Sequence, residues 1–222
     1  MVRPESCTVV FPCLNEGVTI ARLVTEVRQY GPKAIVVDDG STDDTADAAR
    51  AAGAGVISHP ENRGKGAALK TGLAAARQSG CEWAFTIDAD GQHKPQDLPA
   101  FLQCAARTKA LLVIGNRMHS PQALPWLRRH VNRWMSRHIS GRAGQTLPDS
   151  QCGFRLINLN AWAGLRLETD HFEFESEMLL AFIRAGHRVE FVPIQVVAKG
   201  PHSRIHPFRD ACRWLRWWCR AR

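Results

Sequence analysis

The chain has 222 residues, of which 45% are hydrophobic, and carries a formal net charge of +8 at pH 7. This length supports one domain with a full core, and the composition is that of a globular protein rather than a disordered one. No apolar run reaches the roughly 20 residues that span a bilayer, and Pro4 and Glu5 interrupt a signal-peptide pattern, so we expect neither. Seven cysteines without a C-x-x-C pair indicate reduced thiols in a cytosolic protein and argue against a zinc site.

The positive charge gathers in two stretches of the sequence. Acidic and basic residues nearly balance from Met1 to Leu112, whereas residues 117–142 and 202–222 are strongly basic. A local excess of this kind implies an anionic partner. The candidates are a phosphate-bearing substrate, an anionic membrane face and a nucleic acid, but the chain has no recognisable nucleic-acid reader motif.

Short apolar runs alternate with helical patterns along most of the chain. Residues 17–28, for example, repeat apolar side chains at three- and four-residue spacing, and Ser41 or Thr42 can cap the next helix. Such alternation predicts an α/β fold with a mostly parallel sheet that helices cover on both faces. Pro193 marks the last strand as an edge strand or a strand end. We expect strands at 8–11, 34–37, 56–58, 83–87, 111–114, 154–157 and 188–197.

Polar side chains follow four of these strands, at the point where each strand ends. In open parallel sheets, ligands bind beyond the carboxyl ends of the strands. A solvated loop would explain any one polar turn, but four at equivalent positions predict a single polar cleft along one edge of the sheet. The four polar segments are Asn15–Glu16, Asp38–Asp39, Asp88–Asp90 and Gly115–Arg117.

The segment TIDADGQH, residues 86–93, carries the most distinctive of these ends. If the strand stays extended, its alternation puts Asp88, Asp90 and Gln92 on one side. Carboxylate and amide oxygens suit Mg²⁺ or Mn²⁺, which commonly share their ligands with a diphosphate. For an isolated D-x-D pair, the alternative is an acidic turn after a strand.

The segment ENRGKGAALKTGLAAA, residues 61–76, is a glycine-rich turn that feeds a helix. Backbone N–H groups at the start of such a helix can hold a phosphate. The glycine spacing around Lys65 is not that of a P-loop. The alternative is a loop whose residues are small so that the helix packs closely on the sheet.

The motifs FPCLNE, VVDDGSTDDT, NRGKGAALKTG, IDADGQHKP, GNR and DSQCGFR occur in this order. The ordered set resembles the family 2 glycosyltransferases, and within them the dolichyl- or polyprenyl-phosphate branch, over residues 8–194. The resemblance implies a GT-A fold, a donor sugar linked to UDP or GDP, a divalent metal, and an inverting transfer.

The resemblance also implies roles for single residues on the donor side. One group matches the motifs that contact the nucleoside and its ribose, and a second matches the metal and diphosphate motif. Lys65 belongs to a loop that lies near the donor in similar enzymes. The nucleoside group is Pro12, Asn15, Glu16, Asp38 and Asp39, and the metal group is Asp88, Asp90 and Gln92.

On the acceptor side, Arg117 matches an arginine near the transferred or accepting phosphate, and DSQCGFR matches the segment that closes over the sugar. Asp149, its first residue, would be the general base for a hydroxyl acceptor. A phosphate acceptor is already ionised and needs no base, which leaves Asp149 to bind a sugar hydroxyl or support the structure.

Residues 125–144 form a basic helical pattern with an apolar stripe. Its arginines could cradle the acceptor phosphate through Arg128, Arg129 or Arg133, whereas the alternative is a solvated basic helix. In the next helical pattern, residues 172–184, three glutamates favour the helix N-terminus, and the resemblance allows one of them to support an arginine.

The tail, residues 208–220, forms a helix with arginines 209, 213, 216 and 220 on one face. The residues opposite are Phe208, Ala211, Leu215 and Trp218, with Trp214 and Trp217 at the boundary. This segregation predicts a helix that lies in a membrane interface, and the alternative is a helix that docks on the domain.

The resemblance implies a GT-A domain over residues 1–200, and the charge pattern predicts a basic tryptophan-rich tail over residues 201–222. We expect a metal-dependent enzyme that moves a sugar from a nucleotide sugar to a polyprenyl phosphate, held peripherally at the cytosolic face of the membrane. The alternatives are a family 2 transferase with a hydroxyl acceptor on a lipid or saccharide, and a catalytically silent module that docks on membranes.

Overall fold

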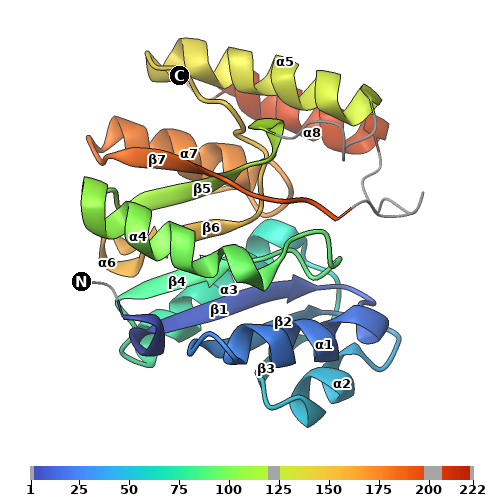
Figure 1. Cartoon of the computed structure of the whole chain (residues 1–222). Helices are drawn as coiled ribbons and strands as arrows, with labels where there is room; N and C mark the ends of the chain where they lie inside the picture. Colours follow the sequence, from blue (N-terminus) through green and yellow to red (C-terminus); the bar gives the residue numbers. More distant parts are fainter. Residues whose placement is uncertain (1–2, 120–125, 198–206, 221–222) are drawn as a thin grey trace.

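The computed structural model describes residues 3–119, 126–197 and 207–220, and its centre is a seven-stranded sheet (Figure 1). The strand order is β3-β2-β1-β4-β6-β5-β7. All neighbouring strands run parallel except β6, which is antiparallel to both β4 and β5. The strands are β1 (Cys7–Cys13), β2 (Lys33–Asp39), β3 (Gly55–His59), β4 (Trp83–Thr86), β5 (Leu112–Asn116), β6 (Arg155–Asn158) and β7 (Val189–Pro193).

Helices cover both faces of the sheet, with α1 and α4 in front of it and α3 and α7 behind it in Figure 1. The buried residues of α1 are Ile20, Leu23, Val24 and Val27, the apolar positions that its sequence pattern predicts. The helices are α1 (Gly17–Arg28), α2 (Thr45–Ala51), α3 (Lys65–Gln78), α4 (Leu98–Thr108), α5 (Trp126–Ala143), α6 (Leu159–Ala163), α7 (Phe174–Arg184) and α8 (Pro207–Arg220).

The predicted fold class, a mostly parallel α/β sheet with helices on both sides, is confirmed. β7 is the edge strand that Pro193 indicates, and this proline is its last residue. Three expectations change. The strand at 83–87 ends at Thr86, and the strand at 188–197 is the shorter Val189–Pro193. Helix α2 begins after Asp44 without a side-chain cap, so neither Ser41 nor Thr42 caps it.

The C-terminal helix α8 packs on the domain through the tryptophan that we expected at its boundary. Trp214 is only 4% exposed, and its Nε1 donates a hydrogen bond of 3.1 Å to Oγ of Ser176 in α7. Its ring lies 5.7 Å from that of Trp134 in α5 and stacks at 5.2 Å on Trp218. Leu215, expected on the apolar face of an interfacial helix, is 45% exposed and does not pack on the domain. The tryptophan face of α8 therefore docks on the domain, which was the alternative for the tail.

None of the helices in the part of the chain that the structure describes is long and apolar enough to cross a bilayer.

Candidate active site

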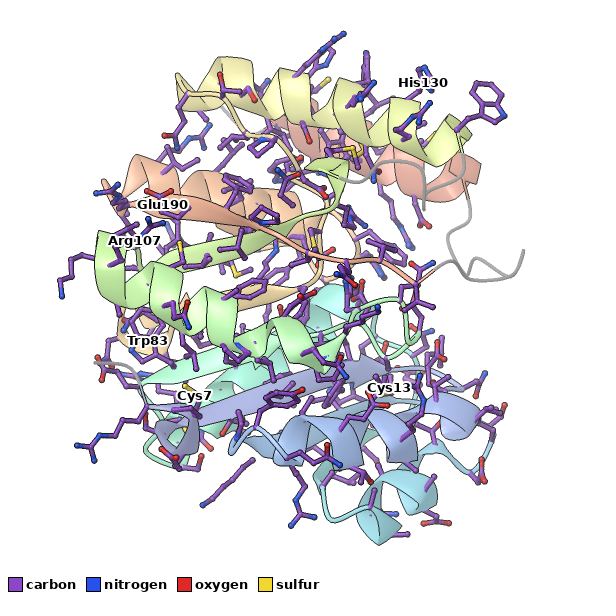
Figure 2. The ribbon with its side chains drawn as sticks, viewed as in Figure 1. Cys7, Cys13, Trp83, Arg107, His130 and Glu190 are labelled. Carbon is purple, nitrogen blue, oxygen red and sulfur yellow. The ribbon has the colours of Figure 1, made fainter. Side chains whose placement is uncertain are left out.

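The carboxyl ends of β2, β1 and β4 lie side by side at the candidate site. Cys13, the last residue of β1 (labelled in Figure 2), lies opposite Asp38 in β2. On the other side of β1, N–H of Ile87 donates to the carbonyl of Val10 at 3.1 Å, so the pairing continues one residue past β4. Asp38 and Asp88 therefore flank the end of β1, as the parallel arrangement predicts.

The turn after β1 holds the turn after β2. Asn15 has a positive φ of 51°, its N–H donates to Oγ of Ser41 at 2.8 Å, and its Oδ1 accepts from N–H of Thr42 at 2.7 Å. N–H of Glu16 donates to Oγ1 of Thr45 at 2.7 Å. Ser41 and Thr42 thus anchor Asn15 instead of capping α2, and the polar groups of this first motif shape the loop after β1.

The two acids at the end of β2 differ in how much of each carboxylate is engaged. Asp39 is 4% exposed; its Oδ1 meets Nδ1 of His59 at 2.7 Å and N–H of Arg63 at 3.0 Å, and its Oδ2 accepts from N–H of Gly64 at 2.8 Å. Asp38 accepts from N–H of Ser41 at 3.0 Å through one oxygen. Asp39 therefore fixes the loop before α3, while Asp38 keeps more acceptor capacity.

Lys65, the first residue of α3, links two carboxylates that come from different parts of the chain. Its Nζ lies 2.6 Å from Oδ1 of Asp88 and 3.1 Å from Oε2 of Glu175, which belongs to the first turn of α7. Phe172 lies beneath the same ammonium, with its ring centroid 5.8 Å away. The sequence allowed a glutamate of α7 to support an arginine. The carboxylate of Glu175 pairs with this lysine, and its charge also favours the charged form of the buried Arg155.

Charge pairing overrides burial at this cluster. Burial alone would lower the pKa of the Lys65 ammonium, but the carboxylates of Asp88 and Glu175 outweigh it and raise that pKa above its usual range. Burial would likewise raise the pKa of Asp88, but Lys65 and His93 hold it well below its usual value. Asp88 is therefore a carboxylate, and Lys65 an ammonium, at neutral pH.

Asp88 is also confined from two other directions. Nε2 of His93 lies 3.9 Å from Oδ2 of Asp88, and Nδ1 of the same ring is buried without a hydrogen-bond partner. A Cβ atom on Gly153 would come within 2.5 Å of the Asp88 carboxylate. Glycine within DSQCGFR thus allows the acceptor-side segment to lie directly against this acid.

Asp90 and Gln92 follow in a turn, not in the extended strand that the alternation required. Oδ1 of Asp90 accepts from N–H of Gln92 at 3.0 Å, and the intervening Gly91 has a φ of 75°. Thr19 of α1 donates through Oγ1 to the carbonyl of Ala89 at 2.6 Å and so holds the middle of the turn. Thr19 and Ala89 are 70 residues apart in sequence, and no motif pointed to this contact.

The oxygen ligands of this turn fit a cation that is shared with a substrate phosphate better than a cation that the protein holds alone. Within the described residues, no three His, Cys, Asp or Glu side chains gather closely enough to hold a metal ion. Asp88 is already paired with Lys65, whereas Asp90 is half-exposed and keeps an oxygen beyond its bond to Gln92. Mg²⁺ typically takes one or two carboxylates and completes its shell with substrate phosphates, which matches this donor set.

The glycine-rich turn before α3 fits the packing alternative. N–H groups of Arg63 and Gly64 are used by Asp39, and N–H of Ala67 donates to the carbonyl of Asp170 at 3.0 Å. A Cβ atom on Gly66 would come within 2.7 Å of Cβ of Phe174. These backbone donors are engaged inside the protein, and the glycines permit close approach.

Arg117, which follows β5, and Asp149 form a buried ion pair. Nε of Arg117 donates to Oδ2 of Asp149 and Nη2 to Oδ1, both at 2.8 Å, and N–H of Arg117 adds a bond of 3.0 Å. Asp149 is 0% exposed and Arg117 3%. Burial would raise the pKa of Asp149, but Arg117 and these hydrogen bonds lower it. Both oxygens of the carboxylate are therefore committed to Arg117.

Arg155, which ends the DSQCGFR motif, ties this segment to α7 from within the core. Its guanidinium is fully buried and donates to three carbonyl groups, those of Cys152 at 2.8 Å, Ser150 at 3.0 Å and Glu175 at 2.7 Å. Burial lowers its pKa, while the charge of Glu175 raises it in part. This arginine fixes both Glu175 and the acceptor-side segment, a role that the motif alone did not indicate.

Helix α5 divides the predicted arginines between its two sides. Arg129 is half-buried and its Nε has no hydrogen-bond partner, and one turn later the buried Nδ2 of Asn132 also has none. Arg133 points to solvent, and the side chain of Arg128 lies outside the described residues. Two unsatisfied donors on the inner side of a basic helix are where an anion would find ready partners.

A sequence model described as glycosyl transferase family 2 matches residues 8–162. The chain belongs to this family. The UDP-N-acetylglucosamine–dolichyl-phosphate N-acetylglucosaminyltransferase of Methanococcus voltae is 28% identical over 211 residues, which cover 85% of this chain and 84% of that protein. The undecaprenyl-phosphate mannosyltransferase of Micrococcus luteus is 27% identical over 202 residues, covering 86% and 83%. The resemblance to the polyprenyl-phosphate branch is thereby confirmed.

A solved structure extends the likeness to the fold. Glucosyl-3-phosphoglycerate synthase from Mycobacterium tuberculosis, crystallised with Mn²⁺, UDP and phosphoglyceric acid, matches with a TM-score of 0.73. The sequences are 23% identical, and the match covers 96% of this chain and 75% of that one. The predicted GT-A fold is confirmed, and the chain is a glycosyltransferase.

Proposed function

We propose that this glycosyltransferase moves a sugar from a nucleotide sugar to the phosphate of a polyprenyl lipid, with inversion at the anomeric carbon. The observation that carries the choice of acceptor is the state of Asp149. A hydroxyl acceptor would require this acid as its base, but its carboxylate is buried and bound at both oxygens by Arg117. A phosphate acceptor is ionised at neutral pH and needs no base.

The donor would lie along the ends of β1, β2 and β4. Asp38 would accept hydrogen bonds from the base or ribose, while Asn15 and Asp39 shape the surrounding loops. Pro12 and Glu16 would line the same end. Lys65, held charged by two carboxylates, would face the diphosphate.

A divalent cation would be held by Asp90 and Gln92, with Asp88 nearby, and would neutralise the diphosphate as it leaves. We propose Mg²⁺ or Mn²⁺, because the offered ligands are oxygens and the solved relative was crystallised with Mn²⁺ and UDP.

The acceptor phosphate would bind on the inner side of α5. Arg129 and Asn132 bring unsatisfied donors to this position, whereas Arg133 faces solvent and Arg117 is committed to Asp149. An oxygen of this phosphate would form the new bond to the anomeric carbon as the bond to the nucleotide diphosphate breaks. Orientation of the two phosphate-bearing substrates would supply most of the rate acceleration.

Two named relatives support the lipid acceptor, since one acts on dolichyl phosphate and the other on undecaprenyl phosphate. We further propose that the protein works peripherally at the cytosolic face of a membrane, where such a lipid exposes its phosphate. Its basic stretches would then serve lipids, not nucleic acid.

The test is incubation with a panel of radiolabelled UDP- and GDP-sugars and a polyprenyl phosphate, followed by organic extraction. We expect label from one donor in the lipid phase. Label that appears only in a water-soluble product would overturn the lipid acceptor, and no transfer from any donor would overturn the enzymatic proposal for this chain.

A further inference from the structure

Helices α5 and α8 lie together at one end of the molecule (Figure 1). Trp134 contacts Trp214 at 5.7 Å and His138 contacts Trp218 at 6.1 Å, so the contacts advance by four residues in both helices. The two helices therefore run parallel. Arg142 closes the pair, with Cζ 3.5 Å from the centre of the Trp218 ring and Nη1 2.6 Å from the Trp218 carbonyl. We name the exposed side of this pair the α5–α8 platform.

The platform exposes an unusual amount of apolar surface. Six large hydrophobic side chains are strongly exposed among the described residues, and four of them belong to these two helices. The four are Trp126 at 69%, Val131 at 46%, and Trp134 and Leu215 at 45% each. A cluster of this kind at one end of a molecule marks an interaction surface, whereas single exposed apolar residues do not.

The charge of the platform has one sign. Residues 126–143 include no aspartate or glutamate, and the one acid within α8, Asp210, is 8% exposed. The exposed arginines are Arg133, Arg137, Arg142, Arg216 and Arg220, and His130 points outward from α5 in Figure 2. The surface thus complements a strongly anionic partner.

We propose that the α5–α8 platform docks the protein on an anionic lipid bilayer. Tryptophan favours the depth of the lipid headgroups, valine and leucine enter the acyl boundary, and arginine reaches lipid phosphates. A nucleic acid would use the arginines but would leave Val131 and Leu215 against a polar backbone. The inference rests on the proposed function only for the reason to dock, which is that a lipid-linked acceptor is reached at a bilayer.

The buried side of the same two helices is joined by hydrogen bonds to the acceptor-side segment and to α7. Ser176 accepts from Nε1 of Trp214 at 3.1 Å and from Nε2 of Gln151 at 3.0 Å. From α5, Ser136 accepts from N–H of Ser150 at 2.9 Å. A bilayer on the platform would therefore be separated by one helix layer, about 10 Å thick, from the segment that carries Asp149 and Gly153.

The test is flotation with phosphatidylcholine vesicles that contain about one-third phosphatidylglycerol, compared with pure phosphatidylcholine vesicles. The variant Arg137→Glu/Arg216→Glu reverses two exposed platform charges. Its matched control, Arg77→Glu/Arg107→Glu, makes the same charge change on the exposed ends of α3 and α4. Circular dichroism checks that both variants fold.

We expect the natural protein to float with the anionic vesicles, more weakly as salt rises, and the platform variant to lose at least about tenfold in partitioning. The control should float like the natural protein. An equal loss in both variants, no loss in either, or tighter binding to a single-stranded RNA than to vesicles at the same salt would overturn the platform. Transfer to a short, water-soluble acceptor phosphate, measured in parallel, reports on the proposed chemistry separately.

Discussion

Gly153 lies so close to Asp88 that adding one methyl group should lower activity without unfolding the protein. In Gly153→Ala the new Cβ would come within 2.5 Å of the Asp88 carboxylate, which must then turn away from Lys65. Because misplacement of a substrate-side group by about 1 Å can cost about a hundredfold, we expect transfer to fall at least about tenfold. The variant should stay folded, although its melting temperature should fall as the pair between Asp88 and Lys65 is weakened. Gly141→Ala, at an exposed helical position with open space around it, is the matched control and should keep full activity; equal activities in the two variants would contradict the role of the contact.

Asp90 offers the most available carboxylate oxygen of its turn. Removing it in Asp90→Ala should lower transfer by at least about a hundredfold, because a charge that stabilises the departing diphosphate is lost. The fold should persist, since the side chain is half-exposed. EDTA should abolish transfer by the natural protein, and added Mg²⁺ or Mn²⁺ should restore it. Activity that survives EDTA, or a variant within a few-fold of the natural rate, would contradict a metal at this position.

The ion pair between Arg117 and Asp149 should reveal itself in the pH dependence of stability. Its lowered pKa in the folded state means that Asp149 contributes stability above about pH 4, and that this contribution is lost as pH falls through the folded-state pKa. In Arg117→Met the buried carboxylate loses its charged partner and keeps only the backbone N–H groups of residues 117 and 151, so its pKa should rise and stability should fall as pH increases. We expect the variant to lose about 3–5 kcal/mol of unfolding free energy at pH 7 and clearly less at pH 4.

Urea unfolding at the two pH values measures this difference. A loss that does not depend on pH would show that Asp149 is not the titrating partner.

At the scale of secondary-structure elements, α8 couples the tail to the domain through one buried ring. Trp214→Phe keeps most of that ring but removes the donor to Ser176. Loss of one buried hydrogen bond should reduce the unfolding free energy by about 1 kcal/mol. The control is Trp217→Phe, on the less buried side of the helix. If the two substitutions cost the same, the bond to Ser176 does not hold α8 in place.

Helices and strands were predictable where their own periodicity decides them, as in the four buried residues of α1. Which face of α8 packs on the domain was not predictable, because its helical pattern shows which side chains are apolar but not which of them another helix covers. Leu215 fits the predicted apolar face, yet the polar contact of Trp214 with Ser176, 38 residues earlier, selects the tryptophan face for burial. Because Trp214 is buried against the domain, deleting α8 would uncover the core. Charge reversal is therefore the better probe of membrane docking.

At the scale of the whole molecule, the order of the strands explains which parts of the site could be foreseen. Parallel strands bring Asp38 and Asp88 to one edge whatever their side chains contact. Which carboxylates remain free depends on distant partners, and these could not be read from motifs. Asp39 is engaged by His59 and by the loop before α3, and Asp149 by Arg117, 32 residues away. Internal engagement thus separates Asp38 and Asp90 from acids that look equivalent in sequence.

The choice of a phosphate acceptor is the central claim, and it can be measured by competition between two matched lipids. The same polyprenyl chain would be offered as its phosphate and as its free alcohol, with one labelled nucleotide sugar, to the natural protein and to Asp149→Asn. We expect label on the phosphate only. Transfer by Asp149→Asn should fall only in proportion to its loss of folded protein. Label on the alcohol, together with a fall of about 10²–10⁴-fold in folded Asp149→Asn, would identify Asp149 as a general base and contradict the phosphate acceptor.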